Sequence, residues 1–171
     1  KKDERVYFTA ENAKRIDMYR HLINQVPNKH LRPFLLGPLL VECSIHNNTN
    51  GQFSAYYKGE DKIGKYGGKN SVDVNRITKK IELKMPVLIE NKCKCVVSKL
   101  DTNVWVQRLP KLDLVYYDPP YNKHPYNIYY FLLDIINNWN TNEEIPDTYR
   151  GQPKNWVKSK YNSFVHAKKE F

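Results

Sequence analysis

The clearest chemical motif of the chain is an acidic residue followed by two prolines and a tyrosine, Asp118-Pro119-Pro120-Tyr121. It directly follows the apolar run 112–117, which predicts a buried strand of a parallel sheet. Ligands of open α/β sheets bind at the carboxyl ends of the strands, so the motif stands where a site is expected. A strand terminator with a surface tyrosine is the structural alternative, but a stop signal needs neither this acid nor this aromatic ring.

These residue types suit the transfer of a methyl group to an exocyclic amine. Such a nitrogen is a poor nucleophile because its lone pair is delocalised into the ring. The carboxylate of Asp118 can accept one N–H and the carbonyl of Pro119 the other, which draws the lone pair out of conjugation. The prolines fix φ and hold that carbonyl in place, while Tyr121 can stack on the base. A sulfonium donor held in line with the amine would then lose its methyl group by direct displacement.

The charge of the chain favours a polyanionic partner. Its 171 residues carry a net charge of +10, and the basic residues between Lys58 and Lys99 alternate with Tyr, Gly and Asn. Positive charge neutralises phosphates, and rings and amides contact bases, although on charge alone a basic protein without such a partner fits equally well. No apolar run approaches the roughly 20 residues of a membrane span. Three cysteines and no secretory signal indicate a reducing, cytoplasmic location.

Periodicity and chain breakers predict the elements that must position these residues. Thr9 is expected to cap a helix over 10–25, which Pro27 ends. A second helix over 31–46 is expected to kink or restart near Gly37-Pro38. The remaining expected elements are a strand at 5–8, a turn at 47–51, a loop-rich stretch at 52–84, a strand at 93–98 with two buried cysteines, and a helix at 126–139.

The segment 118–126, with the sequence Asp-Pro-Pro-Tyr-Asn-Lys-His-Pro-Tyr, resembles the catalytic stretch of Dam-like, adenine-specific DNA methyltransferases. It is closest to a subgroup attached to restriction–modification systems. The resemblance implies an α/β fold: part of a Rossmann-like, S-adenosylmethionine-dependent methyltransferase sheet with flanking helices and a basic DNA-contacting insertion. It divides the chain into a partial methyltransferase core (1–44), a basic, loop-rich insertion (45–90) and the catalytic part of the core (91–171). Further segments that resemble the family are 7–13, 47–53, 64–69, 100–103 and 152–162.

The same resemblance assigns the site residues. The catalytic positions would be Asp118, Pro119, Pro120 and Tyr121. S-adenosylmethionine would lie against Glu11, Asp101 and Asp118, with Glu11 at the ribose and Asp101 near the adenine, although Asp101 fits an N-cap equally well. The partner would be double-stranded DNA with a flipped adenine. Its contacts would come from Asn50, Lys65, Lys69, Asn122, Lys123, His124 and Tyr126. Lys65 and Lys69 lie in a Gly-rich loop at 64–69, and the alternative for these two is that they are solvated loop charges without a partner.

One departure from the family concerns the cofactor. The family carries a Phe-x-Gly-x-Gly-type loop after its first strand, and none of the seven glycines here stands in such a loop. We therefore expect a truncated interior piece that binds S-adenosylmethionine weakly or not at all by itself, with a second chain or a missing segment supplying the loop. The histidines and cysteines show no metal-ligand spacing. An RNA guanine amino-methyltransferase and a non-catalytic nucleic-acid-binding remnant remain alternatives.

Overall fold

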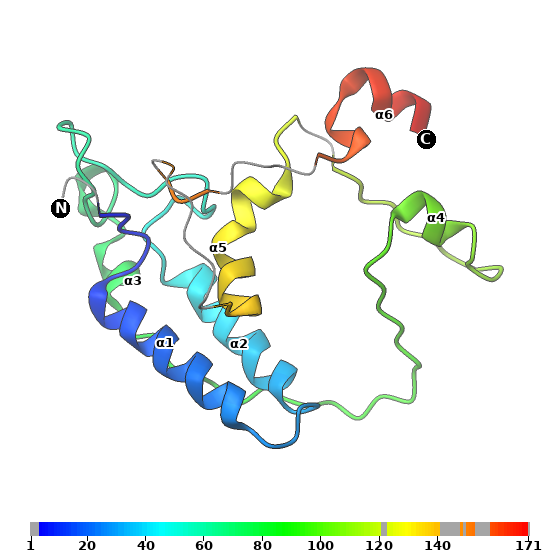
Figure 1. Cartoon of the computed structure of the whole chain (residues 1–171), viewed down its shortest axis with the longest axis horizontal. Helices are drawn as coiled ribbons and strands as arrows, with labels where there is room; N and C mark the ends of the chain where they lie inside the picture. The colour runs from blue at the N-terminus through cyan, green and yellow to red at the C-terminus, as the bar shows by residue number, and fades with distance from the viewer. Residues whose placement is uncertain (1–3, 121–122, 141–147, 149, 153–157, 171) are drawn as a thin grey trace. The chain divides into compact units, whose positions relative to one another are not determined.

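The computed structural model describes residues 4–120, 123–140, 148, 150–152 and 158–170, and this part of the chain is helical (Figure 1). The chain divides into two compact units, one made of Lys1–Val87 and Tyr126–Trp156, the other of Leu88–Pro125 and Val157–Phe171. The helices are α1 (Ala10–Gln25), α2 (Arg32–Ile45), α3 (Val74–Thr78), α4 (Thr102–Val106), α5 (Tyr126–Asn138) and α6 (Phe164–Glu170), with two short 3₁₀ helices, η1 (Lys69–Ser71) and η2 (Lys160–Asn162).

The predicted α/β fold with a Rossmann-like sheet is wrong for the residues that the structure describes. They form no β-strand, and the antiparallel pairing of Lys58 with Gly64 is an isolated bridge. Apolar alternation gives a segment the preference for a pleated surface, but a strand exists only where a second segment pairs with its backbone. The three segments that were predicted to be strands, 5–8, 93–98 and 112–117, have no such pairing partner in the described part of the chain.

The second and third of these segments are exposed as a consequence. Val97 is 95% exposed and Leu114 is 88% exposed, where a buried strand would leave both nearly inaccessible. Cys93 and Cys95 are also exposed, so the prediction that they are buried structural cysteines is wrong. The apolar pattern of these segments therefore indicates side chains that favour burial, but no described part of the chain buries them.

The first predicted helix is confirmed. The Thr9 side chain accepts a hydrogen bond from the backbone N–H of Asn12 at 3.2 Å, which satisfies one of the free amides at the start of α1. Its inner face buries Ile16 and Ile23, and the chain leaves the helix at Val26, directly before a proline.

The second helix is confirmed, but the predicted restart near Gly37-Pro38 is wrong, because α2 runs unbroken from Arg32 to Ile45. Pro33 stands in the first turn of α2, where its missing N–H costs nothing, and Pro38 lies inside the helix. Leu39 and Cys43 follow on the buried face. Their burial against other helices compensates for the backbone hydrogen bond that an internal proline removes.

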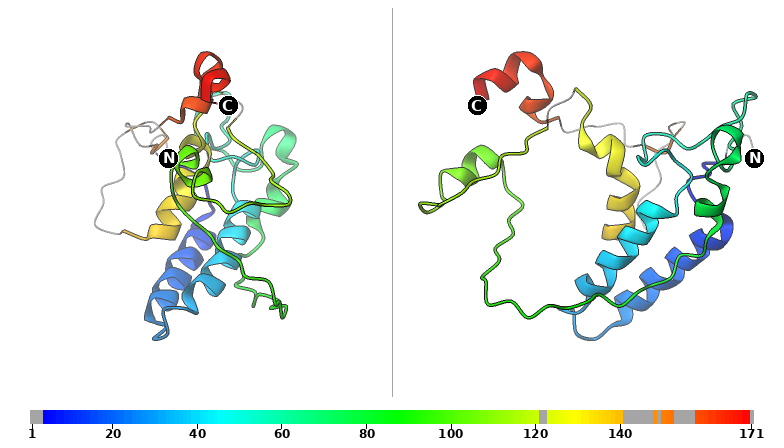
Figure 2. Two further views of the ribbon diagram at one scale, coloured as in Figure 1. Left: turned by 90° about the vertical axis from the view of Figure 1, so that its right-hand side faces the viewer. Right: turned by 180° about the vertical axis from the view of Figure 1, so that it is seen from behind.

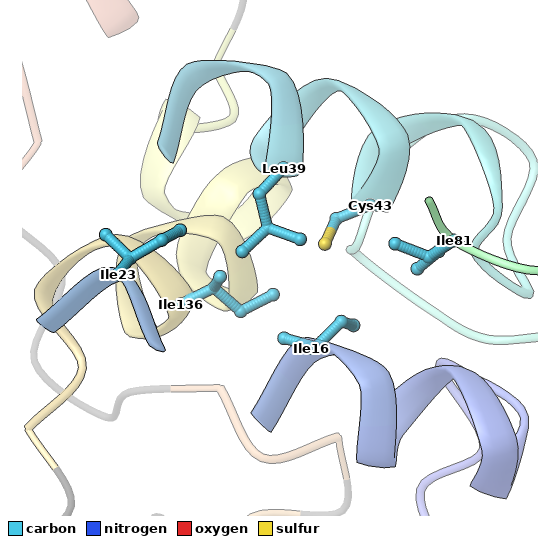
Figure 3. Packing of buried hydrophobic residues seen from close by; sticks show 6 residues of the cluster. All are labelled: Ile16, Ile23, Leu39, Cys43, Ile81 and Ile136. Carbon is cyan, nitrogen blue, oxygen red and sulfur yellow. The ribbon is translucent and has the colours of Figure 1, made fainter. Parts of the chain in front are cut away.

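A core of aliphatic side chains joins α1, α2 and α5 in the first unit. α2 packs against both other helices, and Figure 2 shows the three lying side by side. Burying a side chain of this size stabilises the fold by about 1.5–3 kcal/mol. Figure 3 shows the residues of this cluster, which are Ile16, Ile23, Leu39, Cys43, Ile81 and Ile136.

A second, aromatic cluster holds the N-terminal segment against α5. Tyr7 contacts Tyr56 and Phe131 edge to face, with ring centroids 5.1 and 5.8 Å apart, and Phe53 completes the group. Through Phe53 and Tyr56 the cluster also fixes the chain that follows the turn at 47–51. None of the described helices combines the length and the apolar character that crossing a bilayer requires.

Candidate nucleic-acid interface and catalytic segment

The turn after α2 is polar in sequence but completely buried. Asn47, Asn48 and Thr49, which we call the asparagine turn, each have 0% exposed surface. Buried polar groups are tolerated only when they are hydrogen-bonded. The amide of Asn47 donates to the carbonyl oxygens of Cys43 and Ser44 at the end of α2, and Thr49 Oγ1 donates to Asn47 Oδ1 at 2.6 Å. The asparagine turn thus closes the helix end with its own side chains.

Asn48 connects this turn to segments on either side of it in the sequence. Its Nδ2 donates to the carbonyl oxygens of Val6, at 2.8 Å, and Lys65, at 2.9 Å. Its Oδ1 accepts from the backbone N–H of Gly67 at 3.2 Å. One buried side chain therefore fastens the Gly-rich loop to the N-terminal segment.

Arg76 of α3 holds the same turn from another side. Its guanidinium donates to the carbonyl oxygens of Asn47, at 2.9 Å, and Thr49, at 3.0 Å. Asp73 lies 3.3 Å from Arg76 Nε and accepts a hydrogen bond from the Tyr57 hydroxyl at 2.8 Å. The hydrogen bond from Tyr57, followed by that from Arg76, lowers the pKa of Asp73, because both favour the ionised carboxylate.

The stretch 57–69, which we call the basic loop, is a tight hairpin-like excursion. The N–H of Lys65 donates to the carbonyl oxygen of Tyr57 at 3.0 Å, and a turn between Gly59 and Ile63 reverses the chain. Gly67 adopts φ +100°, and a Cβ there would clash with a methyl group of Val74, so the position requires glycine. The backbone of the loop is therefore defined by hydrogen bonds and close packing.

Positive charge on the basic loop faces outward. The Lys65 side chain is exposed, and the Lys58 ammonium lies 4.8 Å from the centre of the Tyr56 ring, a cation–π distance. Asn50, a predicted DNA contact, directly follows the asparagine turn and is exposed. The backbone of Lys69 lies in η1, but its side chain is outside the described part. Lys65 thus stands on a hydrogen-bonded backbone and Asn50 directly follows the asparagine turn. The predicted role of both residues in binding stays a prediction.

The predicted catalytic segment belongs to the second unit as far as Pro125. Asp118 is exposed and follows extended chain, while Pro119 and Pro120 are half-buried. Tyr121 and Asn122, predicted as base platform and DNA contact, lie outside the described residues.

The predicted contacts after the tetrapeptide lie at the surface. Lys123 and His124 are both exposed. Tyr126 begins α5 in the first unit, 42% exposed, with its ring edge to face with that of Tyr130 at 6.0 Å. These positions are accessible to a ligand, and their role stays a prediction.

Within the second unit, the C-terminal segment reaches the catalytic segment. Asn162, which is buried, donates from its side-chain amide to the carbonyl oxygen of His124 at 3.3 Å. The Tyr161 hydroxyl donates to Asn103 Oδ1 at 2.8 Å, beside the predicted cofactor residue Asp101. Two hydrogen bonds thus join the C-terminal segment around residue 161 to the segments around residues 103 and 124.

The predicted cofactor carboxylates have partners within the fold. Asp101 caps α4 by accepting from the N–H groups of Asn103 and Val104, as its alternative assignment predicted. Glu11 lies in the first unit, 3.5 Å from Arg15 and 3.7 Å from Lys80. Two of the three carboxylates therefore serve the fold, and their assignment to a cofactor stays a prediction.

Sequence reasoning missed the residues that organise these segments: Asn48, Arg76 and Asn162. The cluster of Asn at 47–50 indicated a turn, but nothing in it distinguished the buried Asn48 from the exposed Asn50. Arg76 carried no signal beyond its charge.

Comparison with known proteins shows similarity to methylases. The chain is 31% identical over 138 residues to the type II methyltransferase M.FokI of Planomicrobium okeanokoites, a match that covers 78% of the chain and 19% of that protein. It is 29% identical over 135 residues to the modification methylase StsI of Streptococcus sanguinis, with coverages of 76% and 18%. It is also 29% identical over 153 residues to the type II methyltransferase M.CviAII of Paramecium bursaria Chlorella virus 1, with coverages of 88% and 41%.

These relatives confirm the expected resemblance at the level of type II and modification methylases. The chain spans about a fifth of the length of the first two of them. No family model and no solved structure matches it. The finer assignment, to the Dam-like and adenine-specific class, stays a prediction.

Proposed function

We propose that the protein is a modification methylase of a restriction–modification system that transfers a methyl group from S-adenosylmethionine to the N6 amine of adenine in double-stranded DNA. The observation that carries the proposal is the Asp118-Pro119-Pro120-Tyr121 motif in a chain that is similar to methylases over 76–88% of its length. The motif supplies the acceptors that an exocyclic amine needs, and the relatives' names supply the reaction class.

In this proposal the residues of the chain activate the nitrogen. Asp118 and the carbonyl of Pro119 accept the two N–H groups, and the proline rings hold that carbonyl at a fixed angle. The adenine must leave the duplex first because its amine is otherwise paired. The exposure of Asp118 supports access of an extruded base. S-adenosylmethionine supplies the methyl group as an activated sulfonium substituent.

DNA binding in the same proposal depends on the basic loop. Lys65 is exposed on a backbone that is hydrogen-bonded on both sides, so its ammonium can neutralise a phosphate without disturbing the fold. The overall charge of +10 adds long-range attraction for a polyanion. Such contacts release counterions, and affinity should fall steeply as salt rises.

The test is a methylation assay on the full gene product that carries these residues. Duplex DNA is incubated with methyl-labelled S-adenosylmethionine and digested to nucleosides, and the label is expected in N6-methyladenine. Asp118→Ala should abolish incorporation and leave DNA binding intact. Asp113→Ala, which removes an exposed carboxylate from the same extended segment, is the matched control and should retain activity.

Four other outcomes would overturn parts of the proposal. Label in cytosine would exclude adenine as the target. In a parallel incubation with ribosomal RNA, label in that RNA and none in DNA would favour the RNA methyltransferase alternative. DNA binding without incorporation into any nucleic acid would leave the non-catalytic remnant, and turnover by the Asp118→Ala variant would remove that carboxylate from the mechanism.

A further inference from the structure

The side-chain amide of Asn48 uses both of its hydrogens and its oxygen. The two N–H groups donate to the carbonyl oxygens of Val6 and Lys65, and the oxygen accepts from the N–H of Gly67. The residue has 0% exposed surface, so bulk solvent does not reach these bonds. A buried amide in this arrangement is satisfied only while all three segments keep their places.

The backbone of Asn48 adds two more connections. Its N–H donates to the carbonyl oxygen of Tyr7 at 2.7 Å, and its carbonyl accepts from the N–H of Tyr57 at 3.1 Å. Tyr57 and Lys65 are themselves paired across the base of the basic loop. Asn48 therefore contacts both ends of the hairpin, and it ties them to the aromatic cluster through Tyr7.

We infer that Asn48 is a positioning residue for DNA binding, which acts through Lys65. It fixes the carbonyl of Lys65 and the amide of Gly67, so that the exposed lysine side chain starts from one defined backbone position. This inference rests on the proposed function, because it takes a DNA phosphate as the ligand of Lys65. A loop that is already ordered in the free protein loses little conformational entropy when it binds, and the affinity is higher as a result.

No other common side chain can replace this amide. Aspartate has the same size but offers no donor, and it would place a carboxylate against the carbonyls of Val6 and Lys65. Alanine leaves all three partners unsatisfied. Glutamine is longer by a methylene group, which a completely buried site does not accommodate.

The chain contains a matched control for the loss of such an amide. Asn12 is 1% exposed, and its Nδ2 donates to the carbonyl oxygens of Ile77, at 3.2 Å, and Lys79, at 3.0 Å. Its Oδ1 accepts from the N–H of Ile81 at 3.0 Å. Asn12→Ala therefore removes the same three kinds of bond from a buried position of the same unit, without touching the basic loop.

The experiment is a double-mutant cycle measured by fluorescence anisotropy of duplex DNA with the 171-residue chain. Lys65→Gln in the wild-type background should weaken binding about tenfold at low salt and reduce the salt slope by about one. In the Asn48→Ala background the same substitution should change affinity less than about twofold. In the Asn12→Ala background it should keep its tenfold effect.

The outcomes separate the inference from the proposal beneath it. A full effect of Lys65→Gln in the Asn48→Ala background would overturn the positioning role while leaving DNA binding in place. Failure of the wild-type chain to bind DNA would instead refute the DNA contact itself, and the inference with it.

A second measurement covers an Asn48→Ala variant that does not fold. In the wild-type chain, amide hydrogen exchange at Lys65 and Gly67 should be slow before DNA is added and nearly unchanged afterwards. Exchange that becomes slow only in the presence of DNA would mean that DNA orders the loop, and it would overturn the inference.

Discussion

Replacing Arg76 should destabilise the first unit more than any change of surface charge. The guanidinium donates to three backbone carbonyl oxygens, those of Ile45, Asn47 and Thr49. A hydrogen bond to a charged group contributes about 1.5–3 kcal/mol, and a lost partner leaves a partly buried carbonyl unsatisfied wherever water does not reach it. The Arg76 side chain is 32% exposed, so water replaces part of the loss. We therefore expect Arg76→Ala to lower the free energy of unfolding by about 3 kcal/mol, roughly 1 kcal/mol for each carbonyl.

The assay is urea unfolding followed by the helical circular dichroism signal. With a slope of about 1.5–2 kcal/mol per molar urea, the midpoint should fall by about 1.5–2 M. Arg76→Lys, which keeps the charge as a single point without the planar fork, should show about half of that shift. Lys14→Ala, which removes an exposed positive charge from α1, should stay within about 0.5 kcal/mol of the wild type. Equal midpoints for Arg76→Ala and Lys14→Ala would refute the reasoning.

Two further predictions concern titratable groups of the same unit. Hydrogen bonds from Tyr57 and Arg76 lower the pKa of Asp73, so its stabilising contribution should be complete above the ordinary carboxylate pKa of about 4 and be lost as the pH falls through the lower pKa of the folded state. The gap in urea midpoint between the wild type and Asp73→Asn should accordingly close on acidification, whereas a constant gap would contradict this linkage. Burial raises the pKa of the Cys43 thiol to about 12, and at pH 8 iodoacetamide should label two of the three thiols in the folded chain and all three in urea. Rapid labelling of all three under native conditions would show that the core around Cys43 is open.

Local signals predicted the helices of the first unit well. The Thr9 cap, the apolar stripe and the following proline all lie within the segment that they organise, and α1 begins and ends where they indicate. The apolar residues of α2 keep this helix continuous despite its internal proline. Packing against α1 and α5 decides whether that helix persists, and its apolar residues provide the contacts.

The sheet and the asparagine turn could not be predicted in the same way. A strand depends on a pairing partner elsewhere in the chain, and the alternation in 93–98 and 112–117 contains no information about one. Asn48 bonds to carbonyls 42 and 17 positions away, so its burial follows from tertiary structure. Its neighbour Asn50 has the same residue type and is exposed. The motif at 118–121 was recognisable from sequence because its residues are contiguous.

The order of the elements along the chain has a consequence for proteolysis. α5 follows residues 88–125 of the second unit in sequence, yet its Ile136, 3% exposed, belongs to the core of the first unit with Ile16 and Leu39. Residues 88–100, which lie between Leu39 and Ile136 in the sequence, are all exposed. A single cut there would distribute one hydrophobic core over two peptides. The nicked protein would then behave as a complemented pair of peptides. α5 would be retained by packing against α2 and by hydrogen bonds from Arg20 to the carbonyl oxygen of Asn137 and from the backbone N–H of Phe53 to the carbonyl oxygen of Tyr129.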